Sequence, residues 1–219
     1  MTDILIKIIP LDLAATLSPG ILALTLVVLA SKNHPKAHIL SMLAGALMTG
    51  VGITIIGFVL GNTLNTGLKQ TATESIVDII LGLLFIIYGL KLFLQKERKI
   101  NLDAQEEELK IFKWFGLGLV ITITNFDALF LTFTAAKEVG SADNILTIDR
   151  WILLIINILF FILPITLPLL LKLIFPKTSA PILAKINGFV TKYSRYIILA
   201  MFFIFGIFLL YKGIIFFLK

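Results

Sequence analysis

The feature that most constrains this chain is a series of six apolar segments, each long enough to cross a lipid bilayer as a helix. A hydrocarbon core of about 30 Å needs about 20 apolar residues in helical conformation. The segments span about 10–31, 38–60, 76–94, 111–136, 150–175 and 196–218. Uninterrupted runs such as "DIILGLLFIIYGLKLFL" favour helices over the alternating strands of a membrane barrel. The sequence therefore predicts an all-α membrane protein with six transmembrane helices.

Composition supports this prediction, because 58% of the 219 residues are hydrophobic and only 15% are charged. Such a chain lacks the polar surface of a water-soluble domain. The apolar run after Lys7 continues too far for a cleaved signal peptide, so we expect the first helix to be retained. The chain has no cysteine, which excludes disulfides and thiolate metal sites. We expect neither a cofactor nor a resident metal.

The net charge of +6 is distributed unevenly between the two sides of the predicted membrane protein. The side with both termini holds six lysines and arginines: Lys7, Lys69, Lys137, Arg150, Lys212 and Lys219. The opposite side holds the remaining 13 of the 19 basic residues, so the positive-inside rule puts it in the cytoplasm. Both termini then face outward in a cytoplasmic-membrane protein, and the charge needs no nucleic acid to explain it.

The polar stretch at 95–110 divides the chain into two halves of three helices, 1–94 and 111–219, with 95–110 as a cytoplasmic linker. "FIIYGL" from Phe85 resembles "FFIFGI" from Phe202, and "TLSPGILAL" aligns loosely with "TITNFDALF". Three helices per half is an odd number, so the second half must cross the membrane in the opposite sense. The pattern predicts an inverted repeat, the arrangement of many secondary transporters.

The first apolar segment contains polar residues and a helix-breaking sequence. Counted from a helix start at Pro10, Asp12 lies at the outer interface, as a helix-start residue or as an outer mouth that meets substrate. Pro19 then lies near the midplane, where it removes a backbone hydrogen bond. The surrounding Thr16, Ser18 and Gly20 would help to satisfy the exposed backbone, so this break is either a packing kink or part of a substrate site.

The fourth segment carries Asn125 and Asp127 near the middle of the membrane by the same count. A carboxylate there costs about 3 kcal/mol on insertion scales, so it indicates a functional site unless it serves as a structural clamp between helices. We predict that both residues contact substrate and that Asp127 couples transport to protons. Asn157, in the proline-containing fifth segment, is a further predicted substrate contact.

Small residues along the second segment, Gly45, Gly57 and Gly61 among them, predict close helix packing in lipid. Apolar residues at helical spacing in 182–193 predict either a short amphipathic surface helix or a solvated connector. His34 and His38 flank Pro35 and are expected to be surface residues. No nucleophile–base pair or phosphate loop is present, so we expect no enzymatic activity.

Taken together, "LDLAATLSPGILALTLVVLAS", "MLAGALMTGVGITIIGFVLG" and "FGLGLVITITNFDALFLTF" resemble the GAP or Sap-like proteins. These are peptidoglycolipid- and sulfolipid-addressing membrane proteins of the lysine-exporter superfamily. The resemblance implies a six-helix protein that moves lipids or glycolipids outward. The family's helix 4 usually has an Asn-Pro-Lys-like element, whereas here Phe126 and Asp127 follow Asn125.

The function that this resemblance implies is export of a lipid, glycolipid or related amphipathic molecule, with the site between the breaks of helices 1 and 4. Two alternatives remain open from the sequence. One is export of a divalent cation or small metabolite, which the "NFDALF" element resembles in other exporters of the superfamily. The other is a non-transporting accessory subunit of a lipid-export machinery. Membrane lipid is the expected partner, and a homodimer the expected candidate assembly.

Overall fold

A computed structural model describes residues 2–30, 34–64, 72–94, 111–142, 145–176 and 178–218. Within these ranges the chain forms eight α-helices and no strand. The helices are α1 (Thr2–Ala15), α2 (Pro19–Ala30), α3 (Pro35–Leu64), α4 (Ala72–Leu94), α5 (Ile111–Ile123), α6 (Phe126–Gly140), α7 (Thr147–Ile174) and α8 (Ser179–Leu218). The expected all-helical class is confirmed.

Four helices, α3, α4, α7 and α8, are each long and apolar enough to cross a membrane. The pairs α1–α2 and α5–α6 each reach that length together, although they are bent by 53° and 73° at their breaks. The protein is therefore a multi-pass membrane protein with four to six candidate spans. The two bent pairs are the segments in which the sequence indicated a break.

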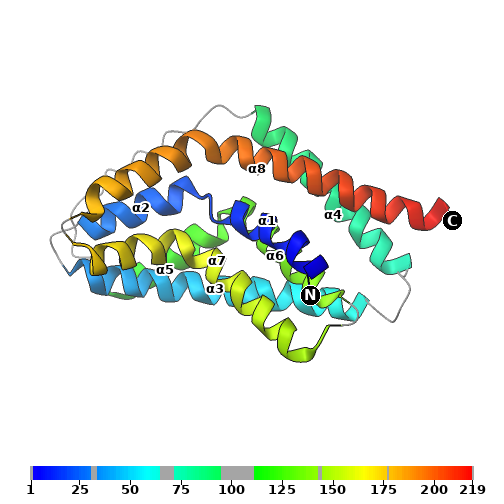
Figure 1. Cartoon of the computed structure of the whole chain (residues 1–219), viewed down its shortest axis with the longest axis horizontal. Helices are drawn as coiled ribbons and strands as arrows, with labels where there is room; N and C mark the ends of the chain where they lie inside the picture. Colours follow the sequence, from blue (N-terminus) through cyan, green and yellow to red (C-terminus); the bar gives the residue numbers. More distant parts are fainter. Residues whose placement is uncertain are drawn as a thin grey trace.

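The broken pair α1–α2 runs through the middle of the molecule, between α8 on one side and α3 with α7 on the other (Figure 1). Helix α8 packs on α4, while α3 packs on both α5 and α6. Helix α1 packs mainly on α6. The first broken pair is consequently enclosed by other helices, as a non-helical backbone at membrane depth requires, whereas α5 of the second pair packs mainly on α3.

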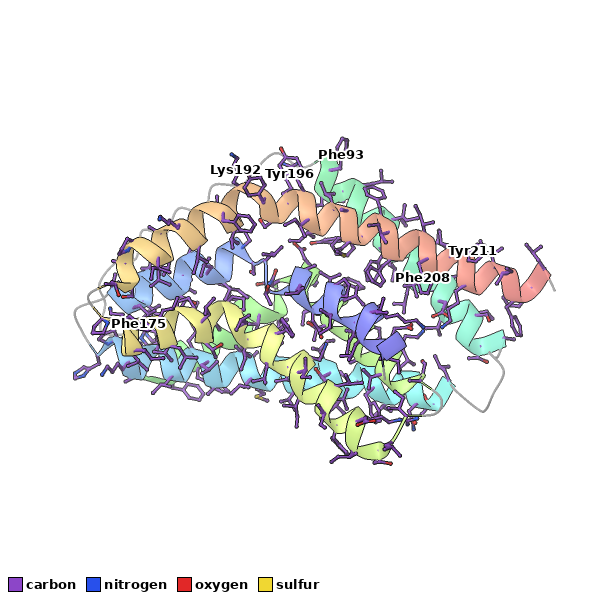
Figure 2. The ribbon with its side chains drawn as sticks, viewed as in Figure 1. Phe93, Phe175, Lys192, Tyr196, Phe208 and Tyr211 are labelled. Carbon is purple, nitrogen blue, oxygen red and sulfur yellow. The ribbon has the colours of Figure 1, made fainter. Side chains whose placement is uncertain are left out.

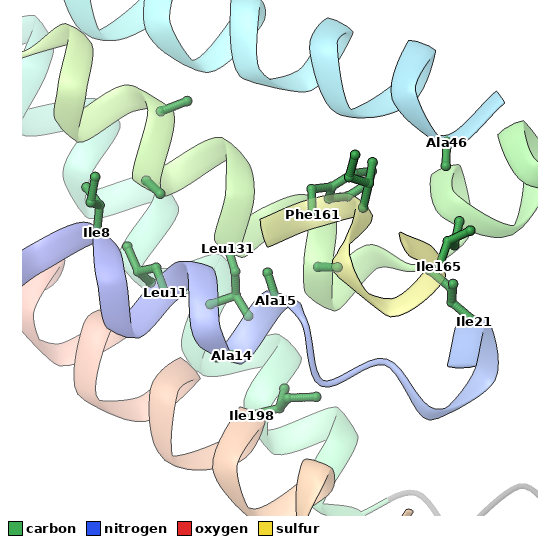
Figure 3. Close-up of a cluster of buried hydrophobic side chains, with 14 of the residues drawn as sticks. Ile8, Leu11, Ala14, Ala15, Ile21, Ala46, Leu131, Phe161, Ile165 and Ile198 are labelled. Carbon is green, nitrogen blue, oxygen red and sulfur yellow. The ribbon is translucent and has the colours of Figure 1, made fainter. Parts of the chain in front are cut away.

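Buried apolar side chains join α1 to α6, α7 and α8 around the first break (Figure 3). They include Ile8, Leu11, Ala14, Ala15, Leu131, Phe161, Ile165 and Ile198. On the outside of α4 and α8, large side chains such as Phe93 and Tyr211 point away from the bundle (Figure 2). An apolar exterior of this kind matches a lipid environment, where helices associate by close packing rather than by hydrophobic burial.

Glycines provide the close packing that the sequence predicted for α3. A methyl group at Gly45 would overlap the backbone of α5, and one at Gly57 or Gly61 would overlap the backbone of α6. The same device joins α4 to α8, because a methyl group at Gly82 would lie 2.8 Å from the carbonyl oxygen of Gly206. These contacts confirm the small-residue interpretation at Gly45, Gly57 and Gly61, whereas nothing lies within 4 Å of a methyl group added at Gly52.

Two expectations about segment boundaries need comment. The segment 182–193 is not a separate surface helix, because it is the first part of the 40-residue helix α8. Its buried residues are Leu183 and Val190, whereas Ile182 and Phe189 are exposed. The periodicity therefore correctly indicated a helix, but this helix is continuous with the last apolar segment. The predicted linker 95–110 lies outside the described residues.

The α4–α8 contact generates a stability prediction. Gly82→Ala should lower the free energy of unfolding in detergent by about 1–3 kcal/mol, the usual cost of overpacking, because the new methyl group meets backbone atoms. The control is Gly116→Ala, where nothing lies within 4 Å of the added atom. That change should be neutral or raise stability by up to about 1 kcal/mol through helix propensity. Equal effects of the two substitutions would contradict the packing argument.

Candidate functional site

The first break separates α1 from α2 at Thr16, Leu17 and Ser18. Helix α2 begins with Pro19, a favoured first helical residue because its missing N–H would have no helical partner there. The backbone carbonyl of Ser18 accepts the first bond of α2, from the N–H of Leu22 at 3.0 Å. Pro19 thus starts a new helix rather than kinking a continuous one.

The second break separates α5 from α6 at Thr124 and Asn125. Asn125 occupies the N-cap position of α6, yet its side chain makes no capping hydrogen bond. Its amide instead donates to the hydroxyl oxygen of Ser18 at 3.0 Å. The two breaks, 107 residues apart in sequence, therefore meet through a direct side-chain hydrogen bond. We call the Ser18–Asn125 contact and the helix ends around it the junction.

Asp127 lies in the first turn of α6, next to the junction. Its carboxylate accepts a hydrogen bond from the Tyr88 hydroxyl of α4 at 2.8 Å. The Tyr88 ring packs against Phe202 of α8, with centroids 5.3 Å apart. Asp127 is thus held by α4 as well as by the positive end of its own helix.

Asp12 is not a helix-start residue, which was one of the two roles that the sequence left open for it. Helix α1 begins at Thr2, so Asp12 lies about 15 Å along it at 1.5 Å per residue. Its side chain is 0% exposed. The expectation was wrong because Pro10, taken as the helix start, lies inside α1.

Asn157 of α7 belongs to the surroundings of Asp12 rather than to the junction. Its amide donates to the Asp12 carboxylate at 2.7 Å and to the Thr132 carbonyl at 3.3 Å. Its own carbonyl oxygen accepts from the Thr54 hydroxyl at 2.7 Å. This polar network joins α1, α3, α6 and α7. The predicted site residues therefore form two groups, one at the junction around Ser18 and Asn125 and one around Asp12 and Asn157.

The other predicted site residues have local positions. Thr16 donates its hydroxyl hydrogen to the Leu13 carbonyl at 2.6 Å, so it satisfies the end of α1. Gly20 is in the first turn of α2 and is partly buried. Both residues lie at the first break, but the side-chain bond to Asn125 comes from Ser18.

A buried ion network was not predicted from the sequence. Lys137 of α6 pairs with Asp78 of α4, and both side chains are 0% exposed. Lys212 of α8 lies 3.0 Å from the second oxygen of Asp78. Glu138 lies 3.9 Å from Lys137 and 3.5 Å from Lys7 of α1. The network connects α1, α4, α6 and α8.

The ion network was missed because Lys137 and Lys212 were counted as loop charges on the outer side. The predicted span ended at 136, whereas α6 continues to Gly140 without a turn signal. The sequence did contain one indication of this network, because Asp78 is a carboxylate inside the apolar run of α4. A carboxylate at that position requires a cationic partner from another helix.

A cavity of about 280 Å³ lies at the opposite end of the molecule from the ion network. It is lined by the last turn of α2, the start of α3 and the end of α7, including Leu29, Lys36, Leu169 and Lys172. Lys172 donates to the Leu29 carbonyl, which satisfies the carboxyl end of α2. The cavity is mainly apolar with a basic rim.

The two histidines do not form a metal site with each other. His34 precedes α3, and His38 stacks on Trp114 of α5 with ring centroids 4.9 Å apart. In the part of the chain that the structure describes, no group of three or more histidine, cysteine, aspartate or glutamate residues is arranged to hold a metal ion.

The fold and the junction define a class of protein: a multi-pass helical membrane protein in which two broken helices meet through polar side chains. The family model described as Sap, sulfolipid-1-addressing protein, matches residues 8–215 of the chain. The match covers most of the sequence, so the chain belongs to this family, as the resemblance indicated. A search of curated proteins and a search of solved structures returned no significant match.

The junction predicts an energetic coupling between the two breaks. Ser18→Ala and Asn125→Ala should each destabilise the protein, and the double variant should lose less than the sum. A coupling free energy of about 0.6 kcal/mol is expected, the average for hydrogen bonds between membrane helices. It can be measured as a double-mutant cycle of unfolding in detergent. The control cycle pairs Ser18→Ala with Thr124→Ala, because Thr124 bonds only to its own helix backbone. Coupling of equal size in that control would contradict the assignment.

The ion network predicts that loss of Lys137 destabilises the protein more than loss of Lys212 does. Lys137→Met should lower the free energy of unfolding by about 3 kcal/mol, because it removes the buried partner of a buried carboxylate. Adding Asp78→Leu should restore most of that loss. Lys212→Met is the matched control and should cost less, since the Lys212 side chain is 23% exposed and Asp78 retains Lys137. Wild-type stability of Lys137→Met would refute this account of the network.

Proposed function

We propose that this protein exports a lipid, glycolipid or related amphipathic molecule across the cytoplasmic membrane as a secondary transporter or translocase. The substrate site is the junction, where the breaks of α1–α2 and α5–α6 meet. The observation that carries the proposal is the hydrogen bond between Ser18 and Asn125 at 3.0 Å. The family description, which names the addressing of sulfolipid-1, supports a role in lipid export.

The chemistry of the junction supports a polar or anionic substrate headgroup. Helices α2 and α6 both begin there, at Pro19 and Phe126. The first N–H groups of a helix have no helical partner and carry the positive end of its dipole. In many transporters, the amino ends of discontinuous helices contact anionic substrate groups in this way. Ser18 and Asn125 add a hydroxyl and an amide as further contacts, and Asp127 offers an acceptor beside them.

An inverted repeat is supported by contacts between matched residues. The two break sequences align at a spacing of 106 or 107; at 107 Ser18 corresponds to Asn125, and these two residues bond to each other. Phe85 aligns with Phe202, and their rings pack at a centroid distance of 5.0 Å. Equivalent residues touch each other only when they lie near the axis that relates the two halves. We therefore propose that a pseudo-twofold axis passes through the junction and through the α4–α8 contact.

The two halves differ in how their equivalent helices pack, and this difference supports a transport mechanism in which the site opens to one side of the membrane at a time. Helix α1 packs on α6 on one side of the junction, but the equivalent pair, α2 and α5, does not pack closely on the other. The cavity beside Leu29 and Lys172 lies on that less tightly packed side. A transporter with two equivalent halves changes its accessible side by exchanging such packings. The structure then represents the conformation that is closed between α1 and α6.

Orientation and assembly complete the proposal. The basic residues favour a cytoplasmic location for the α2–α5 side and outward-facing termini. The open side would then receive substrate from the cytoplasmic half of the membrane. We propose membership of the lysine-exporter superfamily, a homodimeric assembly and no catalytic step. The coupling of transport to protons through Asp127 stays a prediction.

The proposed function can be tested with purified protein in liposomes. A fluorescent sulfated glycolipid and an uncharged glycolipid serve as probes, and their transfer between leaflets is measured under imposed ion gradients. Asn125→Leu removes the bond to Ser18 and fills the junction with apolar atoms. It should reduce transfer at least about tenfold, equivalent to about 1.4 kcal/mol in the barrier. Gly188→Ala is the control, because its added methyl group meets open space on α8.

Transfer by the wild type that Asn125→Leu does not affect would contradict the junction as the site. Absence of transfer by folded wild-type protein under every gradient would favour a non-transporting accessory subunit instead. Stabilisation of the protein by a divalent cation, lost in Asp127→Asn, would favour a cation exporter.

A further inference from the structure

Asp12 is a buried carboxylate with an incomplete set of partners. Its side chain is 0% exposed, and one carboxylate oxygen accepts a hydrogen bond from the Asn157 amide at 2.7 Å. The second oxygen is buried and has no hydrogen-bond partner within the described residues. A carboxylate in an apolar interior is strongly disfavoured unless charge or hydrogen bonds compensate it. Asp12 therefore requires something that the neighbouring side chains do not supply.

The orientation of Asn157 is fixed by its other contacts. The Thr54 hydroxyl donates to the Asn157 carbonyl oxygen at 2.7 Å, which directs the amide nitrogen toward Asp12 and the Thr132 carbonyl. The Thr132 hydroxyl oxygen is also buried without a partner in the described part of the chain. Thr132 and Asp12 thus meet the same amide, and each has one unsatisfied oxygen.

The electrostatic surroundings do not favour a negative charge on Asp12. It lies in the last turn of α1, at the negative end of the helix dipole. No ion pair to Asp12 is present among the described residues, and Lys7 of α1 pairs with Glu138. Helices α6, α7 and α8 pack on α1. Their titratable and charged groups are Asp127, Lys137, Glu138, Asp149, Arg150, Lys172, Lys185, Lys192, Tyr193, Arg195, Tyr196, Tyr211 and Lys212.

These groups are paired elsewhere, are exposed on α8 as the three tyrosines are, or lie near helix ends, and Arg195 donates to the Leu92 carbonyl of α4 at 3.1 Å. Asp127 bonds to Tyr88, and Lys137, Glu138 and Lys212 belong to the ion network. Arg150 donates to the Ala142 carbonyl at 2.7 Å. The contacts of the described residues therefore leave Asp12 to be neutralised by a bound cation.

We propose that Asp12 is a proton-binding site, occupied in the conformation that is closed between α1 and α6. A proton on its unsatisfied oxygen neutralises the charge and creates a donor for a neighbouring acceptor, for which the Thr132 hydroxyl oxygen is available. A sodium ion carries the same charge but requires several oxygen ligands. Two unsatisfied oxygens fit one hydrogen bond better than such a shell.

The position of Asp12 gives the proton a role in the conformational cycle. Its network holds α1 against α6 and α7, three residues before α1 ends at the junction. Separation of α1 from α6 would admit water to Asp12 and release the proton. Proton binding would then favour the closed packing of α1 on α6. The coupling of this step to export rests on the proposed function, whereas the proton site itself does not.

The proton site can be tested by infrared spectroscopy of the purified full-length protein at neutral pH. A protonated-carboxyl band is expected in the wild type and in Asp127→Asn, and its loss is expected in Asp12→Asn. Asparagine keeps an oxygen that accepts from Asn157, so Asp12→Asn should fold. Thr132→Val, a variant of similar shape without the hydroxyl, should retain the band and shift its frequency. A wild-type spectrum identical to that of Asp12→Asn would overturn the proposal, as would an unshifted band in Thr132→Val.

Two further experiments distinguish a bound proton from a bound sodium ion, and the proton site from its coupling to transport. Thermal unfolding in sodium and in choline chloride should give the same midpoint. A sodium-specific rise that Asp12→Asn abolishes would overturn the proton in favour of sodium. In liposomes, the pH gradient should alter glycolipid transfer by the wild type but not by Asp12→Asn, and a retained gradient response in Asp12→Asn would overturn the coupling. If the wild type transfers no lipid, the proposed function fails while the infrared result still decides the proton site.

Discussion

The structure depends on one constraint: in lipid, a backbone that leaves helical conformation must satisfy its polar groups within the protein. Two segments of this chain break near their middles, and each break is satisfied by a nearby hydroxyl or amide. Ser18 begins α2 through its carbonyl and accepts the Asn125 amide through its hydroxyl oxygen. This side-chain bond joins the two breaks, while the hydroxyls of Thr16 and Thr124 donate to backbone carbonyls at the ends of α1 and α5. Helices α3, α7 and α8 then pack against the first broken pair, and glycines of α3 allow its backbone to approach α5 and α6 closely.

Much of this arrangement could be predicted from the sequence. Long apolar runs set the number and position of the candidate spans, because the bilayer fixes the length of a helix that crosses it. Pro19 indicated the first break, because proline removes a helical hydrogen bond, and Asn125 with Asp127 indicated polar groups in the second segment that need partners within the protein. Gly45, Gly57 and Gly61 identified packing faces, because small residues let the backbones of membrane helices approach closely. In each case the residue type itself imposed the structural consequence.

The remaining features depend on which helices become neighbours, and a single sequence does not contain that information directly. Asp12 was misplaced because its depth was counted from Pro10, although proline tolerates a position inside a helix when other helices satisfy the backbone. Lys137 looked like a loop charge because its partner Asp78 lies 59 residues away on α4. Tyr88 was the polar residue of the "FIIYGL" repeat, and its hydroxyl has a role only because α6 presents Asp127 to it.

Two polar networks lie on the same side of the junction, and they differ in how they respond to separation of the helices. In the ion network, Lys137 and Asp78 join α6 to α4, and only the Lys7–Glu138 pair, with Lys7 partly exposed, ties α1 to α6. Separation of α1 from α6 therefore breaks a pair in which only Lys7 is substantially exposed, and it leaves the fully buried Lys137–Asp78 pair intact. The Asp12 network is different, because its central bond joins Asp12 of α1 to Asn157 of α7 and breaks when α1 moves away from α7 as well as from α6. The part of the ion network that joins α4, α6 and α8 thus stabilises a rigid framework. The protonation of Asp12, in contrast, depends on the position of α1 relative to α6 and α7.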